Sequence, residues 1–188
     1  IHKEFGGYLY LATILIDYSV DKEFAILDTC GDCDLCIRAC PTNALDGGFI
    51  QERCISETTQ SKKELTLFEM RHINTLIYGC DICQRVCPKN KGINFIHNTE
   101  FTPTGIEQVP LKEILQMTNK EYFKIYGNNA SSWKGPLIIK RNALCLLMNK
   151  EDTSSIPIIQ ESIDKYSNVL WYNSVAKRVL EKLEVKKK

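Results

Sequence analysis

The pattern of apolar and polar residues divides the chain into an N-terminal apolar run, a cysteine-rich middle and a helical C-terminal part. A glycine pair precedes residues 8–16, which are rich in aromatic and β-branched types and predict a turn leading into a buried strand. Residues 17–28 are polar and predict a loop. Residues 64–74 carry a partial apolar stripe at helical spacing, which predicts a short helix.

Helical periodicity extends from Pro110 to the C-terminus. Pro136 opens one predicted helix that runs to about Met148, and Pro157 stands in the first turn of another. The last helix has an apolar residue at every fourth position: Trp171, Val175, Val179 and Leu183. Antiparallel helices joined by a short polar turn resemble a HEAT-type repeat, although a plain helical bundle has the same pattern. Because one repeat buries its own face poorly, we expect packing on residues 111–126 and on the cysteine-rich part.

Eight of the nine cysteines lie close together in the sequence and form two runs, each followed by proline. The first run is C-x2-C-x2-C-x3-C, the spacing of bacterial ferredoxins, in which the fourth cysteine ligates the other cluster. The second run is C-x2-C-x3-C. Since one tight loop supplies only two or three of the four thiolates of a cluster, the spacing predicts two groups of four. The first group is Cys30, Cys33, Cys36 and Cys87, and the second is Cys40, Cys54, Cys80 and Cys83.

Two structural zinc sites would also use eight cysteines, and disulfides would pair them. Zinc ligands do not usually come as three closely spaced cysteines with a fourth before proline, so the spacing favours two [4Fe–4S] clusters. Cys145 lies in an apolar helical run and is expected to be a buried free thiol. Eight thiols kept available for iron indicate a reducing compartment, and we expect the protein in the cytoplasm.

The 188-residue chain is 44% hydrophobic and 25% charged, a composition that excludes a disordered protein. No apolar run reaches the roughly 18 residues of a membrane helix, and a signal peptide is not recognisable. We therefore expect a monomer that does not bind membranes. The net charge of +1 divides into −4 over residues 1–100 and +5 over residues 101–188. This basic surplus predicts either a solvated helical face or a nucleic-acid contact, for which the candidates are Lys134, Lys140, Arg141, Lys177, Arg178, Lys182 and the tail of Lys186 to Lys188. In the other half of the chain, Lys63 is a further candidate for a phosphate contact.

Three stretches resemble the epoxyqueuosine reductase family: residues 30–45, residues 53–56 (Arg-Cys-Ile-Ser) and residues 77–90, which contain Tyr-Gly-Cys-Asp-x-Cys-Gln-x-Val-Cys-Pro. The resemblance implies an α+β fold, with a bacterial two-[4Fe–4S] ferredoxin-like module followed by an α-helical HEAT-like domain. Because the chain begins with isoleucine, we expect a C-terminal portion of such a protein. The expected parts are the end of a corrinoid-binding domain (1–27), the double-cluster module (28–92), a linker (93–109) and the helical domain (110–188).

The resemblance also implies an activity, the reduction of epoxyqueuosine to queuosine at the wobble position of tRNA with a GUN-type anticodon. The clusters would pass electrons from a donor such as flavodoxin or ferredoxin to a cobalamin. Ser56 and Asp81 are expected beside the corrinoid, and the family's proton donor precedes the cluster module, so no catalytic acid is expected here. Residues 57–63 depart from the aromatic and apolar stretch usual in the family. The alternative is a ferredoxin-type electron-transfer module without catalysis of its own.

Overall fold

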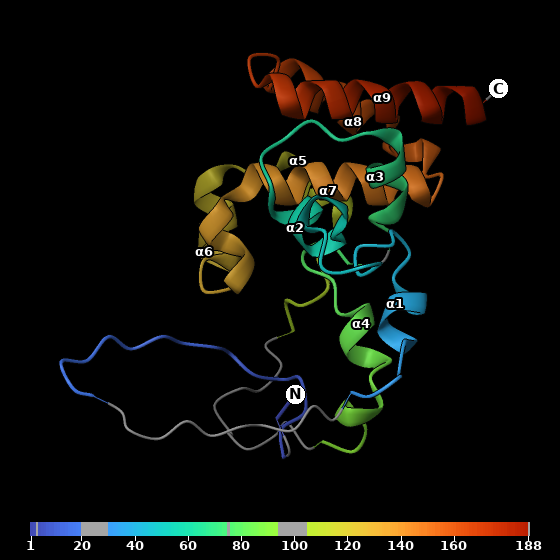
Figure 1. The fold of residues 1–188 in the computed structure, drawn as a ribbon. Helices are drawn as coiled ribbons and strands as arrows, with labels where there is room; N and C mark the ends of the chain where they lie inside the picture. Colours follow the sequence, from blue (N-terminus) through green and yellow to red (C-terminus); the bar gives the residue numbers. More distant parts are fainter. Residues whose placement is uncertain (3, 20–29, 75, 94–104, 188) are drawn as a thin grey trace.

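The computed structural model describes residues 1–2, 4–19, 30–74, 76–93 and 105–187. Two short helices lie side by side at the end of the molecule nearest the N-terminus, and the longer helices are stacked at the opposite end (Figure 1). The two short helices are α1 (Leu35–Ala39) and α4 (Ile82–Arg85). Both helices carry cysteines, so the cysteine-rich motifs lie at one end of the folded molecule.

The cysteine-rich part contains short helices linked by turns. Besides α1 and α4 it contains η1 (Gln51–Arg53), α2 (Ile55–Gln60), α3 (Leu67–His72) and η2 (Pro88–Asn90). The Thr66 side chain accepts a hydrogen bond from the Glu69 amide, and the Glu69 carboxylate accepts one from the Thr66 amide. This reciprocal pair starts α3 because it satisfies amides that have no partner inside the helix. The short helix predicted within residues 64–74 is confirmed.

The C-terminal part contains five α-helices and two 3₁₀ turns within the described residues. They are α5 (Leu111–Gln116), α6 (Asn119–Tyr126), η3 (Ala130–Lys134), α7 (Pro136–Asn149), η4 (Thr153–Ser155), α8 (Ile156–Lys165) and α9 (Leu170–Lys187). Proline stands in the first turn of α7 and of α8, as the sequence predicted. The apolar stripe of α9 faces the core, since Val175, Val179 and Leu183 are buried.

The central element of the core is α7. It packs against α5 and α9 and also against α2 and α3, which belong to the cysteine-rich part. Leu65, Met70 and Ile73 share one continuous apolar cluster with the helices that follow. The packing expected on residues 111–126 and on the cysteine-rich part is therefore confirmed, and one core joins the two parts.

The strand predicted within residues 8–16 is wrong. These residues adopt no regular structure, and their apolar side chains are exposed, with Leu11 and Leu15 each 95% accessible. A strand requires a neighbouring strand to pair with its amides and carbonyls. In the described part of the chain, the β-type pairing is an isolated bridge between His2 and Gly6. The described residues are thus helical rather than α+β.

No helix within the described residues is long and apolar enough to cross a membrane.

Candidate metal centre

The first cysteine group starts in a tight turn. The Cys33 amide donates to the Cys30 carbonyl at 3.3 Å, and Gly31 between them has a φ of +54°. Glycine adopts this left-handed conformation without the penalty that a Cβ atom would add. Cys36 follows on α1, and Cys87 follows α4, which packs against α1. The packing of these two helices brings the end of the second motif to the side of the first.

The second group is assembled from three helices and the residues next to them. Cys40 follows α1, Cys54 is the N-cap residue of α2, Cys80 precedes α4 and Cys83 lies on it. Burial raises the pKa of Cys80, and the nearby thiolates of Cys54 and Cys40 add to the increase. Burial also raises the pKa of Cys83, with contributions from Cys80 and Cys54. Cys80 is thus coupled electrostatically to Cys54 and Cys40, and Cys83 to Cys80 and Cys54.

Cys40 is the member of this group whose pKa is lowered. Burial opposes ionisation of its thiol, but hydrogen bonds from Thr42, Ala44 and Asn43 outweigh that effect and hold the pKa below the ordinary range. The Ala44 amide donates to Cys40 Sγ at 3.3 Å, and the Thr42 hydroxyl oxygen lies 3.6 Å from it. Donors of this kind stabilise a thiolate, and hydrogen bonds to cluster sulfurs are one determinant of the reduction potential.

The donor set is the one that iron–sulfur clusters use, namely thiolates without histidine or carboxylate. Among the described residues, no three or more His, Cys, Asp or Glu side chains converge closely enough to hold a single metal ion. A tetrahedral zinc site needs all its sulfurs about 2.3 Å from one point, whereas the thiolates of a four-iron cluster bind separate irons and stand further apart.

The two groups differ in exposure. In the first group Cys30 and Cys33 are exposed and Cys36 and Cys87 half-buried, whereas all four cysteines of the second group are half-buried. The ninth cysteine, Cys145, is fully buried on α7, and burial raises its pKa to about 12. A thiol of that kind stays protonated and unreactive, as the sequence predicted.

Side chains of α2 and of α7 hold the backbone near the second group in place. The Gly79 amide donates to Thr59 Oγ1 at 2.9 Å, and Gly79 directly precedes the ligand candidate Cys80. Asn142 of α7 donates to the carbonyls of Thr59 and Ile77, both at 2.8 Å. The central helix is thereby tied to the loop that carries Cys80.

The structure shows where the two residues expected beside a corrinoid lie. Ser56 lies in α2, two residues after Cys54, and its hydroxyl oxygen accepts a hydrogen bond from Gln60 Nε2 at 3.0 Å. Asp81 precedes α4, forms no capping bond with its side chain and is paired with Arg85 at 3.1 Å. Both residues adjoin cysteines of the second group. Their role toward a corrinoid remains a prediction.

Two of the predicted nucleic-acid contacts are wrong. Lys140 and Arg141 are fully buried, so RNA phosphates cannot reach them. The Lys140 ammonium group donates to the carbonyls of Leu115 and Met117, and Arg141 binds carbonyls at the end of α2. A buried charge requires such partners, and these residues hold helices together instead of binding RNA.

Lys63 and Arg178 are partly exposed, but each one is already in an ion pair. Lys63 is paired with Glu69 at 2.6 Å. Arg178 is paired with Glu64 and also donates to the Leu65 carbonyl at 2.7 Å. Their contact with nucleic acid remains a prediction, and it would compete with these bonds.

Three residues near Ser56 were not predicted from the sequence. Trp133 Nε1 donates to the Tyr78 hydroxyl at 2.8 Å, and that hydroxyl donates to Gln60 Oε1 at 3.0 Å. Gln60 in turn donates to Ser56, so a continuous hydrogen-bonded chain connects η3 to α2. Because these residues are separated by up to 77 positions, no local motif could have revealed their contact.

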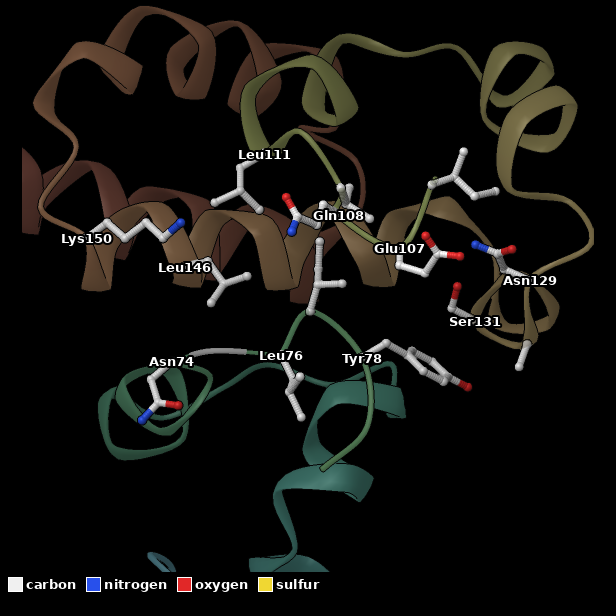
Figure 2. A pocket seen from close by; sticks show the side chains of 14 residues that line it. Asn74, Leu76, Tyr78, Glu107, Gln108, Leu111, Asn129, Ser131, Leu146 and Lys150 are labelled. Atoms are coloured by element: carbon white, nitrogen blue, oxygen red, sulfur yellow. The ribbon is translucent and has the colours of Figure 1, made fainter. Parts of the chain in front are cut away.

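A cavity of about 710 Å³ lies between the loop that precedes Cys80 and the helical part (Figure 2). Asn74, Leu76 and Tyr78 line one wall, and Tyr78 extends toward the end formed by Asn129 and Ser131 (Figure 2). By contrast, the cavity directly against Cys80 has only about 10 Å³, room for about one water molecule.

Comparisons with known proteins agree with this geometry. The profile of the 4Fe-4S double cluster binding domain matches residues 29–90. An epoxyqueuosine reductase of Lactococcus garvieae is 36% identical over 193 aligned positions, covering 99% of this chain and 54% of the relative. The structure of epoxyqueuosine reductase from Bacillus subtilis has a TM-score of 0.79 at 36% identity, over 87% of this chain and 45% of that one.

A second solved structure is a crystal structure of epoxyqueuosine reductase with an epoxyqueuosine-modified tRNA-Tyr stem loop. It has a TM-score of 0.78 at 36% identity and covers 86% of this chain and 44% of that one. The chain thus spans about half the length of the curated relatives it matches.

Proposed function

This chain belongs to the epoxyqueuosine reductase family, and we propose that it carries the double-cluster, electron-transferring part of such an enzyme. Each cluster would be held by one group of cysteines: the first by Cys30, Cys33, Cys36 and Cys87, and the second by Cys40, Cys54, Cys80 and Cys83. The observation that carries the proposal is the packing of α1 against α4, which places the two proline-terminated motifs side by side.

The difference in exposure supports a direction of electron flow. Cys30 and Cys33 are exposed, so a protein donor such as flavodoxin or ferredoxin can approach the first cluster. The second group is half-buried and is next to Ser56 and Asp81, the residues expected beside cobalamin. Electrons therefore enter at the first cluster and leave from the second.

The residues of this chain would set the properties of the second cluster. Hydrogen bonds from the Ala44 amide and the Thr42 hydroxyl stabilise the charge on Cys40, and such bonds to sulfur tune a cluster's potential. Ser56 and Asp81 would face the corrinoid, with its remaining contacts made by groups outside the described residues. When bound, the clusters supply single electrons and the corrinoid supplies the reducing power that opens the epoxide.

The proposed substrate is epoxyqueuosine at the wobble position of tRNA, and the product is queuosine. The solved complex with a modified stem loop supports an RNA substrate, because 86% of this chain shares the fold of that protein. No acidic side chain of this chain is assigned as proton donor.

Anaerobic reconstitution followed by iron analysis tests the cluster assignment. We expect about eight irons per polypeptide, two four-iron clusters, and about half that number in Cys54→Ala, because that variant removes a ligand of the second cluster only. Cys145→Ala is the matched control and should retain all the iron, since its thiol is buried away from both groups. Equal iron content in Cys54→Ala and the unaltered chain, or zinc in place of iron, would contradict the assignment.

Catalysis is tested in the full natural protein. Conversion of epoxyqueuosine to queuosine should require both cobalamin and a reductant, and mass spectrometry of digested tRNA measures it. Reversible reduction of the clusters without any conversion would favour the alternative, a ferredoxin-type module.

A further inference from the structure

Trp133 is an exposed aromatic residue in a fixed orientation. It lies at 72% exposure in η3, although its ring is large and apolar. Its Nε1 group donates to the Tyr78 hydroxyl at 2.8 Å, and the Lys134 ammonium group lies 4.0 Å from the ring centroid. Gly135 follows with a φ of +86°, a conformation that favours glycine and turns the chain sharply into α7.

The surroundings of Trp133 combine cavities with positive charge. The turn that carries it contributes Ser131 to the cavity of about 710 Å³ that Tyr78 also lines. The next residue, Lys134, lines a second cavity of about 310 Å³ together with Lys62 and the half-buried ring of Trp171. An exposed ring on a turn whose residues line two hollows, with a lysine over the ring, has the features of a site for unpaired nucleotides.

The position of this ring relative to the second cysteine group is set by hydrogen bonds. From Trp133 the chain of bonds runs through Tyr78 and Gln60 to Ser56, with donor–acceptor distances of 2.8, 3.0 and 3.0 Å. Three hydrogen bonds thus separate the exposed ring from the residue expected beside the corrinoid. A nucleotide that reacts near Ser56 would have its neighbours in the RNA loop within reach of this surface.

We propose that the exposed face of Trp133 stacks with an unpaired base of the RNA loop, while Lys134 and Lys62 contact its phosphates. This assignment rests on the proposed function and adds to it a surface that grips the loop next to the reacting nucleotide. RNA loops present unstacked bases to aromatic side chains, and stacking tolerates any base because every base has a π-face. The Tyr78 hydrogen bond holds the indole ready for stacking, which reduces the entropy lost on binding.

The test measures the affinity of the full chain, with its clusters reconstituted, for an epoxyqueuosine-modified tRNA-Tyr stem loop. Trp133→Ala should weaken binding about tenfold or more, and Trp133→Phe should restore most of it because phenylalanine retains a stacking face. Lys134→Gln should weaken binding less than Trp133→Ala does. It should also lower the slope of log affinity against log salt by about one, the amount expected for one lost phosphate contact. Phe68→Ala is the matched control, since Phe68 is also exposed but lies on α3, packed against His72.

RNA variants locate the stacked base. Removing one loop base at a time should identify a position whose loss weakens binding to the unaltered chain but not to Trp133→Ala. A blunt duplex of the stem sequence should bind both proteins equally. In a Trp171→Phe background, the stem loop should quench the fluorescence of Trp133.

The outcomes separate this assignment from the function on which it rests. If the unaltered chain binds no stem loop, the proposed RNA substrate fails for this chain. If it binds and Trp133→Ala binds equally well, only the stacking surface is overturned. Loss of reduction by a protein donor in Trp133→Ala, with RNA affinity unchanged, would assign the surface to that donor instead.

Discussion

Helix α7 and residues 8–16 show opposite relations between polarity and burial. On α7, Lys140, Arg141 and Asn142 are fully buried, whereas residues 8–16 expose leucine, isoleucine and tyrosine side chains to solvent. The two segments differ in the hydrogen-bond and packing partners that surround them. Polar groups of α7 meet the carbonyls of neighbouring helices, while the apolar side chains of residues 8–16 are exposed in the part of the chain that the structure describes. Burial in this protein thus depends on available hydrogen-bond partners and packing surfaces, in addition to residue type.

Arg141 is the clearest example on α7. Its guanidinium donates five hydrogen bonds, which use its full donor capacity. Acceptors include the carbonyls of Thr58 and Ser61, at the end of α2, and a helix end favours a positive charge near its free carbonyls. Burial lowers the pKa of Arg141 to about 10, so the group stays charged at neutral pH.

The largest expected effect is that of Arg141→Met. The change leaves buried carbonyls without donors, and we expect a loss of about 3–5 kcal/mol in unfolding free energy. The thermal midpoint, followed by far-ultraviolet circular dichroism under anaerobic conditions, should fall by about 10 °C. Arg71→Met changes an exposed arginine on α3 and should leave the midpoint nearly unchanged. Equal midpoints for the two variants would contradict the inference that the buried bonds of Arg141 stabilise the fold.

Asn142→Leu and Asn149→Leu form a matched pair with a smaller effect. Each removes hydrogen bonds from α7 to backbone carbonyls, at an expected cost of about 2–4 kcal/mol for the buried Asn142 and less for the half-buried Asn149. Asn142 holds the Thr59 and Ile77 carbonyls near Cys80, whereas Asn149 holds Met70 and Ile73 near α3.

Iron analysis separates the two variants. Asn142→Leu should lose iron from the second cluster, because the loop before Cys80 is released, and Asn149→Leu should retain it. The electron paramagnetic resonance signal of the second cluster should change in the first variant alone. Iron loss in both would indicate a general effect of instability.

Lys140 predicts a dependence of stability on pH. Burial lowers its pKa to about 8, Lys165 adds to the lowering, and Glu121 opposes it. Between about pH 8 and 10.5 the unfolded chain holds a proton that the folded chain lacks, so stability rises with pH across this window. Lys140→Met should lack this rise. The thermal midpoint of the unaltered chain, relative to that of Lys140→Met, should therefore be higher at pH 9.5 than at pH 7.5. A constant difference would show that the lysine does not titrate in this range.

The smallest effect is expected in the apolar run. Leu11 and Leu15 are exposed, so replacing both with glutamine should change the unfolding free energy by less than about 0.5 kcal/mol. Leu144→Gln, in the buried centre of α7, is the contrasting change and should lower the midpoint by many degrees. A large loss from the double change at Leu11 and Leu15 would mean that this run is covered, and the comparison would then fail.

Local signals in the sequence predicted the helices well. Proline positions marked the first turns of α7 and α8, and the four-residue repeat identified the buried face of α9. Such signals depend on neighbours along one helix, which the sequence displays directly. The strand within residues 8–16 failed because a strand is defined by a partner, and composition does not reveal whether one is present.

The candidate site was predicted in part. The spacing of the cysteines predicted two groups of four, and the match of the double-cluster domain to residues 29–90 supports the clusters. Lys140 and Arg141 were assigned to RNA because charged residues are usually exposed, although apolar residues surround them on α7. A helix that is apolar on all sides is buried, and that feature could have indicated their true position.

The sequence by itself determined which residues could hold iron, where α7 and α8 begin and which family the chain resembles. These properties depend on residue type and short spacing, which do not change when the chain folds. Only the tertiary structure decided which lysines and arginines are buried, and that Trp133, Tyr78 and Gln60 form one hydrogen-bonded chain. Such contacts join residues that are distant in the sequence, and packing in three dimensions alone selects them.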